Sequence, residues 1–203
     1  TDRGVDLSGW TISSINALNE DGLCMAGQGF HDGQNQAFVV KLDRDGDGLL
    51  DSWERKGIPY IDANGQLCRY TLPDASENHK DIYVEMDAMD GFEPSSNAME
   101  LVRLAFAAAP VSNPDCIPGV NIHIIADERH VQPKNWSDPP WTDFDSFKAL
   151  HFGATEEQGN TEMLAAKRKA FRYCVFARSQ GNKTTVGKAE IVGDDFMVTL
   201  GGW

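Results

Sequence analysis

Alternation of apolar and polar residues predicts three short strands at the start of the chain. Residues 11–18, 23–28 and 36–42 are rich in apolar, aromatic and β-branched side chains. Turn signals separate them, with Asn19-Glu20-Asp21-Gly22 after the first segment and Asp32-Gly33 after the second. The first part of the chain is therefore expected to be short strands joined by tight turns.

From residue 80 the pattern changes to that of an α/β sheet. Residues 80–87 alternate in polarity, which predicts a strand with one apolar face. A helix is expected to follow, with Asn97 as its N-cap and Glu100 three residues on, as in a capping box. Pro110 ends this predicted helix.

The last third of the chain alternates between regular and irregular patterns. Residues 120–124 and 195–200 predict strands, and residues 161–171 predict a second helix. Between them, residues 127–160 are expected to be irregular, because they are rich in proline, aspartate and aromatic residues. A loop of this length is usually functional or packs by its own aromatic side chains. These aromatic residues are Trp136, Trp141, Phe144 and Phe147.

The most specific chemical pattern is an acidic stretch that spans residues 43–54. When Asp43 is position 1 of a calcium loop, Gly48 falls at position 6, where such a loop turns sharply. Carboxylates at positions 1, 3, 5, 9 and 12 and a backbone carbonyl at position 7 are the ligands that a calcium loop of the EF-hand type supplies. The sequence therefore predicts a Ca²⁺ site whose ligands are Asp43, Asp45, Asp47, the Leu49 carbonyl, Asp51 and Glu54.

The elements that flank this loop differ from those of a paired EF-hand. A strand precedes it, and a short helix over residues 50–56 follows, stopped by Gly57 and Pro59. With no second helix to open against, the site is expected to be structural rather than a switch. A second acidic turn at Asp62-Ala63-Asn64-Gly65 is a much weaker candidate for another ion.

The net charge of the chain restricts the classes of partner that it is expected to bind. Thirty-one acidic residues against 18 basic ones give a formal net charge of −13. This charge argues against nucleic acid and anionic membrane surfaces as partners. No apolar run is long enough to predict a membrane span. An extracellular protein in calcium-rich surroundings fits this composition, and Thr1 suggests a processed N-terminus.

The four cysteines do not have the spacing of a zinc site. An even number in a chain expected to be secreted favours at least one disulfide, with three connectivities open. They are Cys24, Cys68, Cys116 and Cys174.

The N-terminal segment resembles a known repeat. Gly9-Trp10-Thr11, residues 15–22 and Gln36-Ala37-Phe38 are similar to the bacterial extracellular His-Ala-Phe repeat, with Gln36 where that repeat often has histidine. One such unit buries little apolar surface by itself. Residues 1–42 are therefore expected to pack on the rest of the chain or on a neighbouring molecule, as in a homo-oligomer or filament.

The remainder, from the calcium loop onwards, resembles a family of secreted bacterial zinc metalloproteases. The similar segments are residues 45–51, 79–87, 107–111, 171–173 and 195–201. The resemblance implies the upper subdomain of a zincin-type protease. In that family a zinc-binding helix with a His-Glu-x-x-His motif follows the last of these strands. None of the five histidines here is followed by glutamate or spaced as a ligand pair, so no catalytic or zinc residue is carried over.

Together these patterns and resemblances predict an α+β fold. The expected parts are a β-strand repeat segment over residues 1–42, a calcium-binding loop and connector over 43–78, and a mixed sheet with two helices over 79–203. The favoured function is a secreted calcium-binding protein that resembles a metalloprotease without its zinc helix. One alternative is a structural extracellular subunit that self-assembles through its N-terminal strands, and another is a sugar- or peptide-binding module that uses the aromatic residues of 136–147. Whether a longer parent protein is an enzyme stays open.

Overall fold

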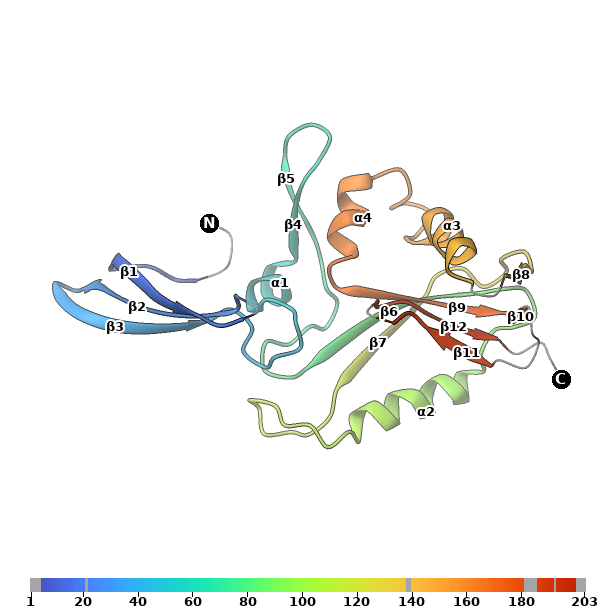
Figure 1. The fold of residues 1–203 in the computed structure, drawn as a ribbon, viewed down its shortest axis with the longest axis horizontal. Helices are drawn as coiled ribbons and strands as arrows, with labels where there is room; N and C mark the ends of the chain where they lie inside the picture. Colours follow the sequence, from blue (N-terminus) through green and yellow to red (C-terminus); the bar gives the residue numbers. More distant parts are fainter. Residues whose placement is uncertain (1–4, 21, 138–139, 181–185, 192, 200–203) are drawn as a thin grey trace.

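The chain has a mixed α+β fold in which a three-stranded sheet and a five-stranded sheet lie on either side of the acidic loop (Figure 1). The computed structural model describes residues 5–20, 22–137, 140–180, 186–191 and 193–199.

The first sheet is an antiparallel meander that contains the three strands expected from the sequence. Its order is β1-β2-β3. At the turn between β2 and β3, Asp32 and Gly33 both have positive φ angles, of 49° and 76°, as a tight hairpin turn requires. The bounds of the strands are Trp10–Leu18 for β1, Cys24–His31 for β2 and Gln34–Lys41 for β3.

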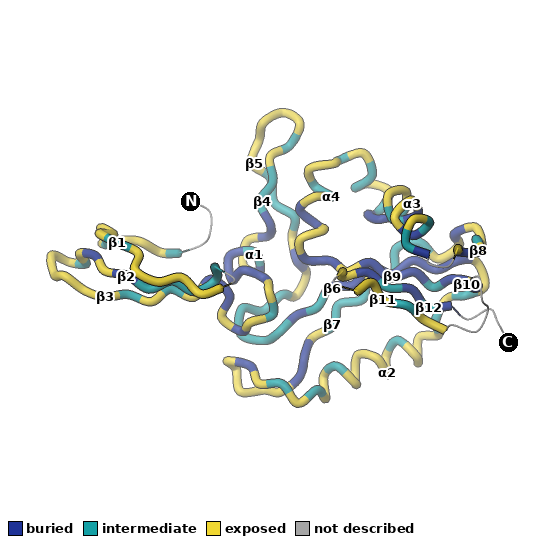
Figure 2. Tube along the Cα trace, in the orientation of Figure 1, coloured by how far each residue is buried: buried dark blue, intermediate teal, exposed yellow. Residues whose placement is uncertain are grey.

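This meander projects away from the rest of the molecule (Figure 1), and most of its length is exposed (Figure 2). Large apolar side chains on it remain in solvent, among them Ile15, Leu18 and Val39, with exposed fractions of 58%, 61% and 71%. At its inner end the next residue, Leu42, is buried, and its N–H donates to the Leu23 carbonyl. The contact with the remainder of the chain therefore lies near the acidic loop.

A short helix and a hairpin follow the loop. The helix α1 (Asp51–Lys56) was expected, whereas the hairpin of β4 (Ile58–Ile61) and β5 (Leu67–Tyr70) was not. Asp62 Oδ1 accepts hydrogen bonds from the N–H groups of Asn64 and Gln66, at 2.9 and 2.7 Å. The weaker acidic candidate, Asp62-Ala63-Asn64-Gly65, is thus the turn of this hairpin. Its aspartate carboxylate stabilises the turn by accepting hydrogen bonds from backbone N–H groups.

The main sheet has the order β11-β12-β9-β6-β7. β6 pairs in parallel with both β7 and β9, and β9 pairs in parallel with β12, while β11 is an antiparallel edge strand. A separate pair, β8 with β10, is also parallel. The bounds are Asp81–Ala88 for β6, Asn121–Ala126 for β7, Asn135–Trp136 for β8, Phe171–Ala177 for β9, Ser179–Gln180 for β10, Gly187–Ala189 for β11 and Phe196–Thr199 for β12.

Helices cover the two faces of this sheet unequally (Figure 1). The helix α2 (Ser96–Ala107) lies on one face, and α3 (Trp141–His151) and α4 (Thr161–Lys167) lie on the other. The expected N-cap of α2 was wrong, because the Ser95 side chain accepts the hydrogen bond from the Ala98 N–H, at 3.2 Å.

The helix α3 corrects the expectation of an irregular segment over residues 127–160 and adds a third helix to the two expected over residues 79–203. Phe144 and Phe147 are buried three residues apart on one side of it, and Trp136 is buried against both rings. Since these rings fill the main core, they are not free to bind a sugar or a peptide.

All four cysteines are free thiols, which corrects the expected disulfide. Each lies on a different part of the fold: Cys24 on β2, Cys68 on β5, Cys116 in the loop after α2, and Cys174 buried within β9. The spacing of the cysteines along the sequence does not indicate that they lie on different elements of the fold.

As the sequence predicted, the helices in the described part of the chain are too short or too polar to span a membrane.

Candidate metal centre

The acidic loop links the end of β3 to α1 and is wrapped around its own first carboxylate. Asp43 Oδ1 accepts a hydrogen bond from the Gly46 N–H at 2.7 Å, and Oδ2 accepts one from the Gly48 N–H at 2.9 Å. Gly46 and Gly48 have φ angles of 80° and 95°, which only glycine adopts readily. The two glycines therefore let the backbone turn tightly enough to direct neighbouring side chains inward.

The carboxylates at positions 1, 3 and 5 of the loop meet. Oxygens of Asp43, Asp45 and Asp47 all lie within 4.8 Å of one another. Local hydrogen bonds orient them, since Asp45 Oδ1 accepts from the Asp47 N–H at 3.3 Å and Asp47 Oδ1 accepts from the Leu49 N–H at 2.7 Å. The side chain of Leu49 itself is buried in the main core, which fixes the loop against the rest of the protein.

Glu54, at position 12, lies in the first turns of α1 with only 8% of its surface exposed. Neither of its carboxylate oxygens has a hydrogen-bond partner among the described residues, and the same holds for Asp45 Oδ2. Buried polar atoms are nearly always hydrogen-bonded, so three buried carboxylate oxygens without a donor indicate a missing positive partner. A bidentate glutamate at position 12 is what a calcium loop supplies.

Burial and mutual repulsion disfavour the ionised form of these acids. Burial, reinforced by the charges of Asp47 and Asp45, raises the pKa of Glu54 to about 9. Burial likewise raises the pKa of Asp45 to about 7, with Asp47 and Asp43 as further causes, and that of Asp47 to about 6. A divalent cation among these oxygens reverses the effect, because the ligands then bind it in their ionised form.

Asp51 is the predicted side-chain ligand that the structure does not bring to the others. Its Oδ1 accepts a hydrogen bond from the Arg44 N–H at 2.7 Å, and its Oδ2 lies 3.7 Å from Arg44 Nη2. The residue at position 9 of a calcium loop often binds the ion through a water molecule, so the orientation of Asp51 is compatible with indirect coordination of this kind.

One acidic residue at this centre was missed by the sequence reasoning. Asp81, the first residue of β6, has an oxygen within 4.8 Å of oxygens of Asp47 and Glu54. Its backbone N–H also donates to Asp47 Oδ2 at 2.8 Å. The spacing of a loop motif gives no sign of a residue so far along the chain.

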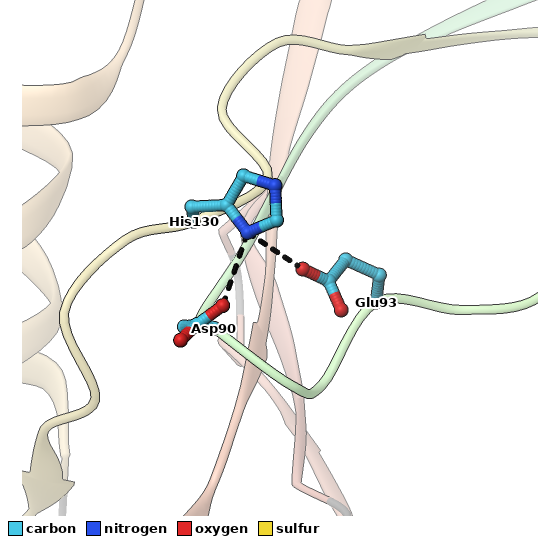
Figure 3. A group of neighbouring side chains, drawn as sticks. All are labelled: Asp90, Glu93 and His130. Atoms are coloured by element: carbon cyan, nitrogen blue, oxygen red, sulfur yellow. Dashed lines mark hydrogen bonds and ion pairs between the residues drawn. The ribbon is translucent and has the colours of Figure 1, made fainter.

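Other groups of acids in the described part of the chain already have protein partners. His130 Nδ1 lies 3.0 Å from Asp90 Oδ1 and 3.3 Å from Glu93 Oε1 in an exposed cluster (Figure 3). A second cluster consists of Glu85 and Asp87 on β6 together with Asp127, and Glu85 pairs with Lys167. A third includes Asp195, which accepts from Lys148 Nζ at 2.7 Å. In the second cluster Asp127 Oδ2 also has no hydrogen-bond partner among the described residues, but Lys167 supplies a positive charge there. In the acidic loop both oxygens of Glu54 lack a partner.

No family model, curated protein or solved structure matches this chain.

Proposed function

We propose that the loop from Asp43 to Glu54 binds one calcium ion. The observation that carries the proposal is the pair of buried, unpartnered oxygens of Glu54, a residue with an oxygen within 4.8 Å of oxygens of Asp47 and Asp81. Calcium takes six to eight oxygen ligands and accepts irregular geometry, whereas magnesium keeps several waters and is seldom enclosed by protein carboxylates alone. The all-oxygen ligand set excludes the soft metals that prefer sulfur or imidazole.

In this proposal the ion has a structural role in a secreted protein. The loop stands between the exposed N-terminal meander and the main sheet, so an ion there holds the junction of the two (Figure 1). The net charge of −13 suits an extracellular setting in which calcium is abundant. A loop followed by a single six-residue helix has no second helix to move against, which favours stability over signalling.

We also propose that residues 79–203 are related to the upper subdomain of secreted zinc metalloproteases and are not catalytic as given. The order strand, helix, strand over β6, α2 and β7 supports this relation. Four histidines are each within hydrogen-bond distance of a carboxylate rather than of one another: His79, His123, His130 and His151. The sequence has no His-Glu-x-x-His pair that would hold and activate a hydrolytic water.

Calorimetric titration of the calcium-free protein tests the calcium site. We expect one ion per chain, a loss of binding by at least about a hundredfold for Glu54→Gln, and a loss of less than about tenfold for Asp51→Asn. The difference is expected because both oxygens of Glu54 are buried and have no hydrogen-bond partner among the described residues, whereas Asp51 is hydrogen-bonded to the Arg44 N–H. Absence of binding by the unmodified protein, or equal affinities for the two variants, would contradict the proposal.

The alternative function, self-assembly through the N-terminal strands, is favoured by a different observation. Among the strands that the structure describes, the outer strands β1 and β3 each pair only with β2. The sheet carries Ile15, Leu18 and Val39 in exposed positions. Edge strands with exposed apolar residues are ready sites for pairing with another copy of a chain.

Sedimentation velocity over a range of concentrations tests this alternative. We expect oligomers of the unmodified chain, and a shift towards monomer for the double variant Leu18→Lys/Val39→Lys, because charges on a strand oppose edge-to-edge pairing. Leu150→Lys is the matched control, since Leu150 is as exposed as Val39, at 72%, but lies on α3 and not on the meander. A monomer at every concentration would refute self-assembly, as would dissociation by the control variant alone.

A further inference from the structure

The orientation of Asp51 leaves the loop one side-chain ligand short of the predicted set. Both of its carboxylate oxygens face Arg44, at 2.7 Å from the backbone nitrogen and 3.7 Å from Nη2. In the described part of the chain, Asp51 belongs to none of the groups of acids whose oxygens lie within 4.8 Å of one another. A cation held by the rest of the loop therefore has room for an oxygen from elsewhere.

Asp81 offers that oxygen from outside the loop. One of its oxygens lies within 4.8 Å of oxygens of Asp47 and Glu54. Two ligand oxygens that are each about 2.4 Å from one calcium ion are at most about 4.8 Å apart. The separation of these three carboxylates is thus that of a shared coordination sphere. The side chain of Asp81 is fully buried, at 0% exposure, so bulk water does not solvate its charge.

The position of Asp81 is fixed by hydrogen bonds on each side. Its Oδ2 accepts from the Ser76 N–H at 2.7 Å, and its Oδ1 lies 2.6 Å from His123 Nε2. The ring of His123 is stacked on Tyr83, with centroids 4.3 Å apart, which holds the histidine in place. A carboxylate oxygen that accepts one hydrogen bond keeps a lone pair for a metal, and ligating carboxylates are usually held in this way.

The unpartnered oxygens of Glu54 are an independent indication of a ligand at this point. Glu54 and Asp81 are both buried acids, yet only Asp81 receives donors from the described part of the protein. Two buried carboxylates this close repel each other strongly unless a cation lies between them. An ion bound only by the first half of the loop would leave this repulsion in place.

We propose that Asp81 is a direct ligand of the same calcium ion, so that the metal centre joins the loop to the first residue of β6. This inference rests on the proposed function, because it requires that the loop bind calcium. The ion then holds the loop to β6, an interior strand of the main sheet. Affinity depends on the fold of both parts and not on the loop sequence alone.

Terbium luminescence separates a ligand from a residue that merely supports the site. Tb³⁺ prefers oxygen ligands as calcium does, and its decay rates in H₂O and D₂O count the water molecules bound to it. For Asp81→Ala we expect about one additional bound water and a calcium affinity at least about tenfold weaker. The matched control is Asp115→Asn, because Asp115 also accepts from a histidine, His79 Nδ1 at 2.9 Å, but lies in none of these acidic groups.

The outcomes distinguish this inference from the proposed function. An unchanged water count in Asp81→Ala overturns direct ligation whatever the affinity, and so does a fall from two bound ions to one, which would place Asp81 at a separate ion. If the unmodified protein binds neither calcium nor terbium, the proposed function fails as well.

If Asp81→Ala does not fold, Asp81→Asn provides the test. Its amide oxygen keeps the shape but is a weaker, neutral ligand, so we expect an unchanged water count and an affinity at least about tenfold lower. An affinity within about twofold of that of the unmodified protein would overturn the inference.

Discussion

Chelation of calcium is expected to lower the melting temperature of the protein by about 5 to 10 °C. A ligand that binds only the folded state adds about 2.7 kcal/mol when its concentration is a hundred times its dissociation constant. About 1 kcal/mol moves the melting temperature of a protein of this size by about 2 to 4 °C. The measurement is differential scanning calorimetry in excess calcium and in excess chelator at the same ionic strength.

The expected loss of stability comes from the group of acids that the proposed calcium ion neutralises. Without the ion, carboxylate oxygens lie within 4.8 Å of one another in two groups that share Asp47: Asp43 with Asp45 and Asp47, and Asp47 with Glu54 and Asp81. Leu42, Leu49 and Leu50 bracket or lie within the loop and are all buried, so repulsion among the acids acts directly on core packing. The effect of chelation is therefore expected to reach the main cooperative transition instead of a local one.

Glu54→Gln is the control for this experiment. It removes one charge from the group and weakens binding, so its melting temperature should be nearly the same with and without calcium. A melting temperature of the unmodified protein that does not respond to chelator, together with no calcium by elemental analysis, would contradict the structural role of the ion. An equal response of Glu54→Gln and the unmodified protein would show that calcium acts at another site.

The parts of this fold that the sequence predicted are those with a local signal. The strands of the meander and the first strand of the main sheet follow from alternation, and the loop follows from ligand spacing within 12 residues. The mixed α+β class also follows from these patterns and is confirmed. Each of these signals is contained in one short segment, so no knowledge of the tertiary structure is needed.

The parts that were missed depend on contacts between distant segments. The helix α3 follows two prolines and is rich in aromatic residues, so its composition suggested a loop, although Phe144 and Phe147 have helical spacing. The N-cap of α2 was misplaced because Asn97 and Glu100 fit a capping box, whereas it is the Ser95 hydroxyl oxygen that accepts the hydrogen bond from the Ala98 N–H. Asp81 had no local mark of a ligand, since only the tertiary fold brings it to the loop.

The second large effect on stability is expected from substitution of Lys167, the last residue of α4, whose charged side chain is buried. Its side chain is 3% exposed, and its ammonium pairs with Glu85 Oε2 and lies 2.6 Å from Glu157 Oε2. The rings of Phe152 and Phe171 also lie near it, each 5.2 Å from Nζ. Burial alone lowers the pKa of Lys167, but the charges of Glu85 and Glu157 outweigh it and raise the pKa, so the lysine stays charged.

Lys167→Met is therefore expected to lower the free energy of unfolding by about 3 to 5 kcal/mol. Removal of one partner leaves Glu85, which is 0% exposed, as an uncompensated buried acid, and this is the costly step. The double variant Lys167→Met/Glu85→Gln removes the charges of both substituted residues and should recover most of the loss, because Met and Gln are neutral and similar in volume to Lys and Glu. The remaining acid, Glu157, is partly exposed to solvent. The matched control Lys169→Met, at an exposed position two residues away, should change stability by less than about 0.5 kcal/mol.

Urea unfolding at pH 7 in saturating calcium measures all three variants while the metal centre stays constant. The coupling energy between the two positions follows from the double-mutant cycle. If Lys167→Met were no less stable than Lys169→Met, the ammonium would contribute nothing beyond an exposed charge. If the double variant were as unstable as Lys167→Met, the loss would come from packing against Phe152 and Phe171 and not from the unpaired charge of Glu85.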